Sequence, residues 1–362
     1  MPMWPDRRIL DLLDIELPII QAPMAGSVGS EMVIAVSEAG GLGSLPCAML
    51  SVDQARNELG IIRQRTSRSI NVNFFCHRPP AANPARDAAW KTRLHGYYAE
   101  LGLDPEAPGG GANRAPFDDA MCDVVVDVKP EVVSFHFGMP ERRLVARVKA
   151  YGAKVLSSAT SVDEARWLED QGCDAVIAQG YEAGGHQGMF LTDDVAGQVG
   201  TMALVPQIVD AVKVPVIASG GIADARGIVA AFALGAAAAQ IGTAYLLCPE
   251  AKTTATHRAA LKTAKDNASV LTNVFTGRPA RGIVNRIIRE VGPMSEIAPE
   301  FPLAATAVAP LRANAEANGS GEFSPLWTGQ AGALARELPA GELTTRLAAD
   351  ALARLHARHS PA

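Results

Sequence analysis

Residues 214–243 read VPVIASGGIADARGIVAAFALGAAAAQIGT: an apolar run, a Gly-Gly turn, a helical stretch and a second apolar run. Both runs are continuous rather than alternating in polarity, which is typical of parallel strands buried on both faces. The stretch between them ends at Leu234-Gly235, and glycine often terminates a helix. The segment therefore predicts a strand–helix–strand unit with parallel strands.

The same alternation of apolar runs and helical stretches extends over the first 250 residues. Two helix starts match a capping box, at Ser51-Val52-Asp53-Gln54 and at Ser161-Val162-Asp163-Glu164. Eight runs can be counted, at 18–22, 41–45, 69–75, 132–137, 153–158, 174–179, 214–219 and 237–243. Eight strand–helix repeats predict an α/β fold of the (β/α)8, or TIM, barrel class, with a doubly wound open sheet as the alternative.

Three segments are set apart from this barrel, which is expected to span residues 1–250. Residues 77–123 form an insertion rich in Pro and Gly after the third strand, and this insertion is either a lid or a surface addition. Residues 251–332 are predicted to form a smaller, mainly helical subdomain over the barrel mouth. The last segment, 333–362, contains an amphipathic helix expected to pack back on the barrel.

Composition excludes several classes of protein. The chain has 362 residues, of which 48% are hydrophobic and 20% charged, so it is not disordered. With 33 Lys+Arg against 38 Asp+Glu and no basic cluster, no nucleic-acid partner is expected. The five cysteines contain no CxxC pair, so neither a disulfide scaffold nor a zinc site is predicted.

One charge-free stretch, residues 229–248, is long enough to span a bilayer. It is mostly Ala and Gly and is interrupted by polar residues, so we interpret it as a helix, a turn and a buried strand. The first residues also lack the apolar core of a signal peptide. We therefore expect a cytoplasmic protein with no membrane partner.

In a barrel, the loops that follow the strands form the active site. The last two expected strands end in Ser219-Gly220-Gly221 and in Gln240-Ile241-Gly242-Thr243. Glycines let backbone N–H groups approach an anion closely, and the helix that starts near Asp224 would add its positive end. Two such turns on adjacent strands predict a phosphate site, although each alone would be an ordinary tight turn.

Earlier strand ends carry small, soft or amide side chains. The first expected strand ends in Ala22-Pro23-Met24, which suits the edge of a flat ring, with ordinary packing as the alternative. Asn71 and Asn73 share one face of the third strand. A buried amide needs a partner, which is either a ligand with ring nitrogens and oxygens or another side chain.

Two histidines follow strand ends on the same rim. The sixth expected strand ends at Gln179, and the loop after it surrounds His186 with glycines. The fourth ends in Ser134-Phe135-His136. Imidazole is a common general base or hydrogen-bond donor near neutral pH. No third ligand accompanies the pair, so no metal is expected.

Together these segments resemble the nitronate monooxygenase family, formerly called 2-nitropropane dioxygenase. The resemblance covers about residues 10–250 and resumes at Pro325–Gln330, and its most specific part is Glu182-Ala183-Gly184-Gly185-His186. It implies FMN at the barrel mouth. The residues that would contact the cofactor are Ala22, Pro23, Met24, Asn73, Gln179, Gly184, Gly185, Ser219, Gly220, Gly221, Gln240, Gly242 and Thr243.

The resemblance also implies a reaction, in which O2 oxidises an alkyl nitronate to a carbonyl compound and nitrite. His186 would be the catalytic residue, as a base towards a neutral nitroalkane or as a proton donor to a bound nitronate. His136 and Met24 would line the substrate pocket. Relatives often place tyrosines near the substrate, whereas residues 299–303 here contain Phe301 and no Tyr. The expected partners are the nitronate and O2, and the expected state is a monomer or homodimer.

Two other functions remain open from the sequence. The same barrel could carry an NAD(P)H-dependent FMN reductase of quinones or enoyl-thioesters, which would need no GxGxxG motif. It could also bind a phosphorylated ligand without catalysis. The cluster of glycines with two histidines favours an enzyme over this last alternative.

Overall fold

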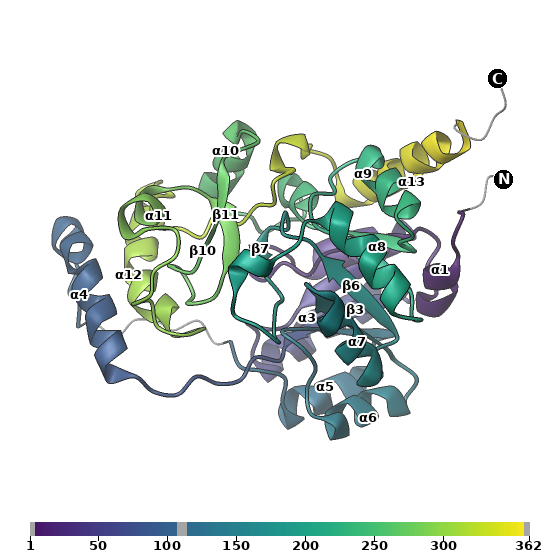
Figure 1. Ribbon diagram of the computed structural model, residues 1–362, viewed down its shortest axis with the longest axis horizontal. Coiled ribbons are helices and arrows are strands. Elements are labelled where there is room, and N and C mark those ends of the chain that lie inside the picture. The colour runs from purple at the N-terminus through teal and green to yellow at the C-terminus, as the bar shows by residue number, and fades with distance from the viewer. Residues whose placement is uncertain (1–3, 107–113, 358–362) are drawn as a thin grey trace.

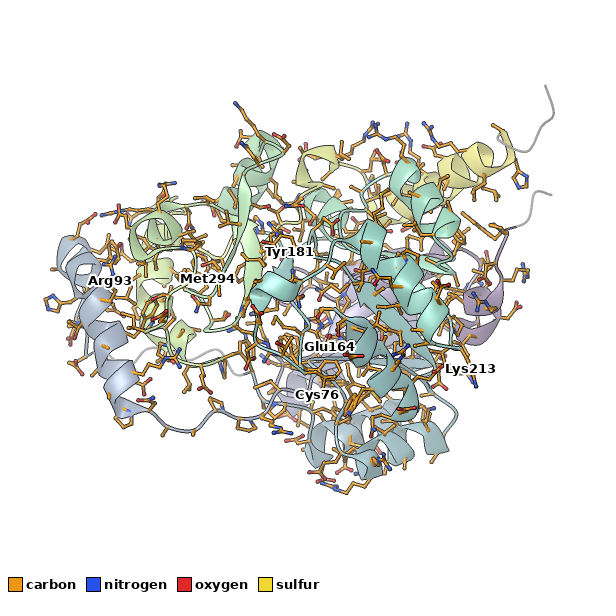
Figure 2. All side chains as sticks on the ribbon, in the orientation of Figure 1. Cys76, Arg93, Glu164, Tyr181, Lys213 and Met294 are labelled. Carbon is orange, nitrogen blue, oxygen red and sulfur yellow. The ribbon has the colours of Figure 1, made fainter. Side chains whose placement is uncertain are left out.

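The computed structural model describes residues 4–106 and 114–357, in which a parallel barrel lies beside a smaller unit (Figure 1). Figure 2 shows Arg93 and Lys213 near opposite ends of the molecule, with Tyr181 and Glu164 between them. The barrel strands are β1 (Ile19–Gln21), β2 (Gly43–Pro46), β3 (Ile70–Phe75), β4 (Val132–His136), β5 (Lys154–Ala159), β6 (Ala175–Gln179), β8 (Val216–Ser219) and β9 (Ala238–Ile241).

The sheet closes on itself. Its strands pair in parallel in the spatial order β1-β9-β8-β6-β5-β4-β3-β2. Leu42, just before β2, forms a parallel bridge with Ile20 of β1. The Leu42 N–H donates to the Ile19 carbonyl, and the Leu42 carbonyl accepts from the Gln21 N–H, both at 3.0 Å. The predicted (β/α)8 barrel is therefore confirmed, and an open sheet is excluded.

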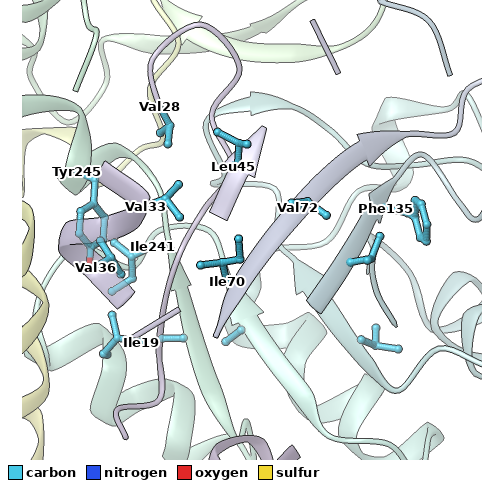
Figure 3. Packing of buried hydrophobic residues seen from close by; sticks show 14 of the residues in the cluster. Ile19, Val28, Val33, Val36, Leu45, Ile70, Val72, Phe135, Ile241 and Tyr245 are labelled. Carbon is cyan, nitrogen blue, oxygen red and sulfur yellow. The ribbon is translucent and has the colours of Figure 1, made fainter. Parts of the chain in front are cut away.

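Helices surround the barrel and bury its outer face. In Figure 3, Val33 and Val36 lie close to Ile19 and Ile241 of the sheet. The helices around the barrel are α2 (Ser30–Glu38), α3 (Val52–Arg65), α5 (Asp119–Val128), α6 (Arg142–Ala150), α7 (Val162–Asp170), α8 (Thr201–Ala211), α9 (Ala225–Ala233) and α13 (Ala340–Ala357), with short 3-10 turns at Val195–Gly197, Thr243–Leu247 and Gly332–Leu334. The last helix, α13, packs on α9 and α2.

The two predicted capping boxes differ in the structure. At Ser51 both reciprocal hydrogen bonds of the box are present. At Ser161 the hydroxyl accepts from the Glu164 N–H, but the Glu164 carboxylate accepts from the N–H and hydroxyl of Thr160. That second box is thus only half formed, because the carboxylate of Glu164 has other partners.

A short helix closes the end of the barrel opposite the predicted site. In α1 (Arg8–Leu13), Ile9 and Leu13 are fully buried, and they belong to one apolar cluster with Val132 and Ala175 at the starts of β4 and β6. Burial of apolar surface here stabilises the barrel at this end. The end of the barrel that α1 covers is therefore apolar.

The smaller unit contains both helices and a sheet. Its helices are α4 (Pro84–Leu101), α10 (Ala255–Thr263), α11 (Arg286–Val291) and α12 (Ala304–Ala317). Its strands are β10 (Ser269–Thr272) and β11 (Ala280–Ile283), and β11 also pairs antiparallel with β7 (Gly185–His186) of the barrel loop. The loop after β6 is thus one strand of the neighbouring sheet.

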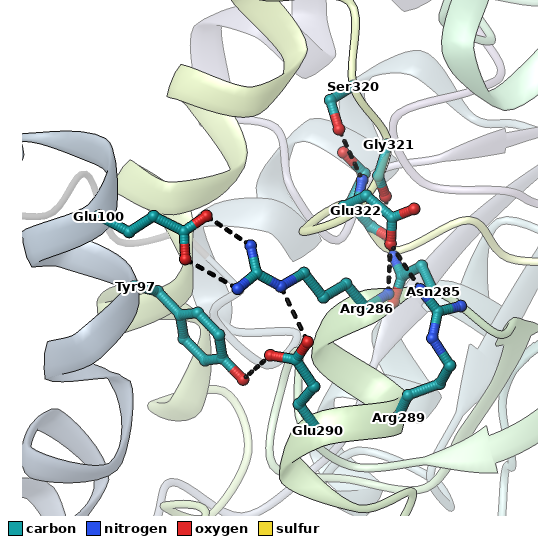
Figure 4. A network of polar contacts seen from close by, with 10 residues as sticks. Tyr97, Glu100, Asn285, Arg286, Arg289, Glu290, Ser320, Gly321 and Glu322 are labelled. Carbon is teal, nitrogen blue, oxygen red and sulfur yellow. Dashed lines mark hydrogen bonds and ion pairs between the residues drawn. The ribbon is translucent and has the colours of Figure 1, made fainter.

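The helix from the 77–123 insertion packs on this smaller unit. Trp90 and Leu94 of α4 share a core with Val308 and Leu311 of α12. Figure 4 shows Arg286 of α11 between two acids: its guanidinium binds the Glu100 carboxylate at 2.6 and 2.7 Å and Glu290 at 2.9 Å. These exposed ion pairs add specificity to an interface whose stability comes mainly from apolar burial.

The long uncharged stretch forms a helix and a buried strand, as predicted. It contains the end of α9, all of β9 and the 3-10 turn at Thr243–Leu247. Over residues 4–106 and 114–357, none of the helices has both the length and the apolar character that a bilayer crossing needs.

We expect Trp90→Ala to destabilise the α4–α12 interface. Trp90 is 1% exposed, and its indole N–H donates to the Ala304 carbonyl at 3.2 Å. Truncation of a buried tryptophan typically costs about 3–5 kcal/mol. Urea unfolding followed by circular dichroism should show this loss, and a smaller loss for Trp90→Phe. Equal unfolding of wild type and Trp90→Ala would contradict this packing.

Candidate active site

A cavity lies at the C-terminal ends of the strands. Every residue that the sequence analysis assigned to the site lines it: Ala22, Pro23, Met24, Asn73, His136, Gln179, Gly184, Gly185, His186, Ser219, Gly220, Gly221, Gln240, Gly242 and Thr243. These residues come from six strand ends that are far apart in the chain. The barrel brings them together because all its strands point to the same rim.

One side of the cavity presents backbone N–H groups. Gly220 and Gly221 have φ values of 108° and 69°, in the left-handed region that favours glycine. Among the residues that the structure describes, no acceptor contacts the N–H groups of Gly220, Gly221 or Gly242. The Thr243 hydroxyl accepts from the Gly329 N–H at 2.9 Å and keeps its own hydrogen free to donate. This side can bind an anion.

The start of α9 contributes less to this side than predicted. Its N-cap residue is Asp224, whose carboxylate accepts from the Arg226 N–H at 2.9 Å and also pairs with the Arg226 guanidinium. The positive end of the helix is therefore already capped by an acid. The capacity to bind an anion rests on the glycine turns instead.

Amide groups line a second side. Asn71 does not line the cavity, and its amide nitrogen donates to the Ser44 hydroxyl at 3.0 Å. The Asn73 amide nitrogen donates to the Ser134 hydroxyl at 2.9 Å, so a protein partner satisfies that end. Gln240 differs, because its buried Oε1 has no donor among the described residues. A ligand N–H would satisfy that oxygen.

The surface between these polar sides is small and apolar. A Cβ placed on Gly242 would lie 3.5 Å from the Ala22 Cβ and 3.6 Å from the Met24 sulfur. These distances are ordinary van der Waals contacts, so Gly242, Ala22 and Met24 converge on one patch. The residues present thus fit a flat ring with polar edges that also carries an anionic group, as FMN does.

Two side chains fix the loop that carries His186. The His186 carbonyl accepts from the Gln179 amide at 3.0 Å and from His136 Nε2 at 3.2 Å. A carbonyl only accepts, so Nε2 of His136 is protonated and its Nδ1 accepts from the Ser158 hydroxyl at 2.6 Å. Both ring nitrogens of His136 therefore have protein partners, and His136 holds the loop in place.

The glycines of this loop serve its packing as well as the cavity. A Cβ on Gly184 would lie 2.5–2.6 Å from the backbone of Thr328 and Gly329, which leaves no room for a side chain. The Gln330 N–H donates to the Glu182 carbonyl at 3.0 Å. Close approach of the 328–330 segment is one physical reason for the glycine at 184.

Sequence reasoning missed two arginines beside the histidines. Arg114, from the insertion, lines the cavity, and its guanidinium lies 5.8 Å from the Phe301 ring. The guanidinium of Arg278 lies 4.1 Å from the Phe137 ring. Within the described residues neither forms an ion pair. No motif marked these residues, because they come from an irregular segment and from the smaller unit.

These arginines and burial set the protonation of the histidines. The pKa of His186 lies well below 6.5, mainly because the imidazole is buried and also because the positive charge of Arg114 is near. Burial and the two guanidiniums lower the pKa of His77 to about 4, and burial lowers that of His136 to about 4. Burial also lowers the pKa of Arg114, to about 10, so it stays charged. At neutral pH the cavity has neutral imidazoles in a positive surrounding, which favours an anionic ligand.

Aromatic rings enclose His186 on its other sides. The Phe301 ring lies 5.2 Å from the imidazole and 4.8 Å from His77, and Trp327 lies 5.6 Å from His186. Phe301 thus occupies the position that the sequence analysis singled out for its missing phenol. It supplies an apolar edge rather than a hydroxyl, so this wall excludes water without offering a hydrogen bond.

Comparison with known proteins gives a consistent result. A family model described as nitronate monooxygenase matches residues 6–350. A nitronate monooxygenase of Pseudomonas aeruginosa is 42% identical over 342 residues, which is 94% of this chain and 97% of that protein. One of Paraburkholderia phytofirmans is 41% identical over 343 residues, 94% of each chain.

Two solved structures are similar to this chain over almost its whole length. A nitroalkane oxidase from Streptomyces ansochromogenes aligns with a TM-score of 0.89 and 39% identity, over 98% of this chain and 100% of that one. FabK from Thermotoga maritima aligns with a TM-score of 0.75 and 28% identity, over 98% and 99% of the two chains.

His77 should make stability depend on pH. Its pKa is about 4 in the folded protein and about 6.5 in an unfolded chain, so between these values the unfolded state holds more protons. Stability should therefore fall as the pH drops from 6.5 towards 4, by at most about 1.4 kcal/mol per pH unit for this proton. Urea unfolding should show that His77→Phe loses less stability than wild type between pH 7.5 and 5.

The same substitution at the exposed His95 of α4 controls for the loss of a histidine as such. Other buried histidines and the carboxylates titrate equally in all three proteins. Parallel pH profiles for wild type and His77→Phe would show that His77 is not held neutral by its surroundings.

Proposed function

The chain belongs to the nitronate monooxygenase family, and from this premise we propose that it uses FMN and O2 to convert an alkyl nitronate into a carbonyl compound and nitrite. The observation that carries the proposal is the composition of one cavity. Unpartnered backbone N–H groups of the glycine turns line one side, and a neutral His186 and the guanidinium of Arg114 line another.

The residues that would hold FMN follow from the donors and acceptors present. Gly220, Gly221 and Gly242 would donate backbone N–H bonds to the phosphate, with the Thr243 hydroxyl beside them. The unpartnered oxygen of Gln240 would accept from a ring N–H, and Met24 would lie against the ring. When bound, the flavin supplies the electron transfer and the O2 chemistry.

The protein contributes a site that favours negative charge on the substrate. Arg114 and Arg278 are both desolvated, but the charges of Asp193 and Glu164 act on Arg278, whereas no described carboxylate pairs with Arg114. The charge of Arg114 therefore acts on the cavity with the least screening. Phe301 and Trp327 limit the access of water to His186. A nitronate is an anion and a nitroalkane is neutral, so we expect the nitronate to be the better substrate.

His186 would handle the proton. With its pKa held well below 6.5, the imidazole is neutral at physiological pH and can accept a proton from the carbon of a nitroalkane. A nitronate has already lost that proton and does not need the base.

The five cysteines are free thiols, which supports a reducing compartment such as the cytoplasm.

Gly221→Ala should weaken flavin binding. An L residue at a φ of 69° costs about 1–2 kcal/mol, and a Cβ there would lie 3.3 Å from the Glu182 Cβ, so the N–H groups of the turn should shift. A loss of this size lowers FMN affinity about tenfold. Absorbance of the purified protein, followed by FMN titration, measures the effect.

Gly102→Ala is the matched control, because Gly102 has a φ of 66° at the end of α4 and lies outside the cavity. It carries the same strain and should retain normal flavin content. If Gly221→Ala also retained normal flavin content and affinity, Gly221 would not be part of the FMN site.

His186→Asn should strongly reduce turnover of neutral nitroalkanes while FMN stays bound. A general base contributes roughly 10²–10⁴ to a rate, so kcat/KM for nitroethane should fall by about that factor. The fall for ethyl nitronate should be smaller. Nitrite release under air and flavin absorbance provide the two measurements.

Wild type sets the reference for this test. If the wild-type protein released no nitrite from any alkyl nitronate, and NADH or NADPH bleached its flavin without oxygen, the proposed activity would be wrong. The protein would then be an NAD(P)H-dependent reductase.

A further inference from the structure

A threonine that no sequence motif singled out contacts the catalytic imidazole. We propose that Thr276 is a positioning residue that keeps Nε2 of His186 protonated, so that an unprotonated Nδ1 faces the substrate. The inference deepens the proposed function and rests on it, because it concerns how the base of that reaction is prepared.

The contact is short and buried. Thr276 lies in the turn between β10 and β11 and is 2% exposed. Its Oγ1 is 2.9 Å from His186 Nε2 and 3.4 Å from the Arg278 carbonyl oxygen. His186 itself is held by the pairing of β7 with β11 and by the bonds to its carbonyl. The imidazole and the hydroxyl are therefore fixed relative to each other.

The direction of the proton follows from what each group can do. A hydroxyl has one hydrogen, and a carbonyl can only accept. If the Thr276 hydroxyl donates to the Arg278 carbonyl, its oxygen is left to accept from Nε2–H of His186. That chain satisfies every member within the described residues, whereas the reverse direction leaves the Arg278 carbonyl without its donor. His136 provides a precedent in the same cavity, since a carbonyl fixes its proton on Nε2.

The electric field of the cavity favours the same tautomer. Nδ1 of His186 has no partner among the described residues, and it is not one of the enclosed polar atoms, unlike Nδ1 of His77. His186 lines the cavity together with Arg114, and because Nε2 is turned to Thr276, Nδ1 is the ring nitrogen left for the cavity. A positive neighbour favours a lone pair over an N–H group at that position.

The consequence is confined to one chemical step. With a neutral nitroalkane, the proton on the carbon beside the nitro group moves to Nδ1, and the electron pair of that C–H bond stays on the substrate as the nitronate. The imidazole gains one positive charge and the substrate one negative charge, and nothing is oxidised in this step. Arg114 and Arg278 disfavour the imidazolium but stabilise the nitronate that forms with it.

The test compares Thr276→Val, which removes the hydroxyl, with Thr276→Ser, which keeps it. A charged residue that holds a catalytic histidine in its tautomer contributes about 10⁴ to kcat, and residues that hydrogen-bond the second ring nitrogen of a functional histidine contribute roughly 10–100-fold. We expect Thr276→Val to lower the ratio of kcat/KM for nitroethane to that for ethyl nitronate by about tenfold or more. In Thr276→Ser this ratio should stay within about threefold of wild type.

A second readout reports the proton itself. Protein labelled with ¹⁵N at histidine gives distinct NMR signals for protonated and unprotonated ring nitrogens, and His186→Asn assigns the signals of His186. Wild type and Thr276→Ser should show a protonated Nε2 and an unprotonated Nδ1. Thr276→Val should show a mixture or the opposite tautomer.

Three outcomes would overturn the proposal: a protonated Nδ1 in wild type, an unchanged tautomer in Thr276→Val, or equal losses on nitroethane and ethyl nitronate in Thr276→Val. A melting temperature near that of wild type shows that each variant is folded. If wild type releases no nitrite from either substrate, the proposed function fails, and the NMR comparison still decides the role of Thr276.

Discussion

The carbonyl oxygen of His186 is the point at which the barrel holds its candidate catalytic loop. Gln179 at the end of β6 and His136 at the end of β4 both donate to it. Gln179 also accepts from the Gly188 N–H at 2.6 Å. Further along, the fully buried Glu164 carboxylate of α7 accepts from the N–H groups of Phe190 and Leu191. The loop is therefore fixed at successive residues, which is what a preorganised site requires.

Holding the loop this way links the two parts of the chain. Residues 185–186 leave the barrel and pair with β11, so the smaller unit places Thr276, Phe301 and Trp327 beside His186. Phe75 and Phe137 of the barrel lie on its other sides. The barrel thus supplies the strand-end residues of the cavity, and the surroundings of the imidazole come from both parts of the chain. A substitution that disturbs packing in the barrel or in the smaller unit should therefore displace His186.

The sequence predicted the barrel and its rim well because both depend on local patterns. Continuous apolar runs mark buried parallel strands, and the residues after them, such as Met24 and Gly221, must meet at one end of a closed barrel. The arginines and Thr276 could not be predicted this way. They lie in segments without periodicity, and Thr276 reaches its partner 90 residues away in the chain. The reason for glycine at 184 also needed the fold, since the neighbour that excludes a side chain there is the segment 328–330.

The two unpaired guanidiniums are difficult to explain by stability alone. Burying a charge without a counter-ion is costly, and an aromatic face such as Phe137, 4.1 Å from Arg278, returns only about 0.5–2 kcal/mol. Arg278 also donates to the Met189 carbonyl and feels the charges of Asp193 and Glu164, so the uncompensated charge is mainly that of Arg114. The same burial that penalises these charges also keeps His186 neutral and strengthens their action on anything in the cavity. An anion that enters would gain the attraction that the folded protein leaves unused. The buried guanidiniums thus lower the stability of the free protein, and the same guanidiniums give the cavity its preference for an anionic substrate.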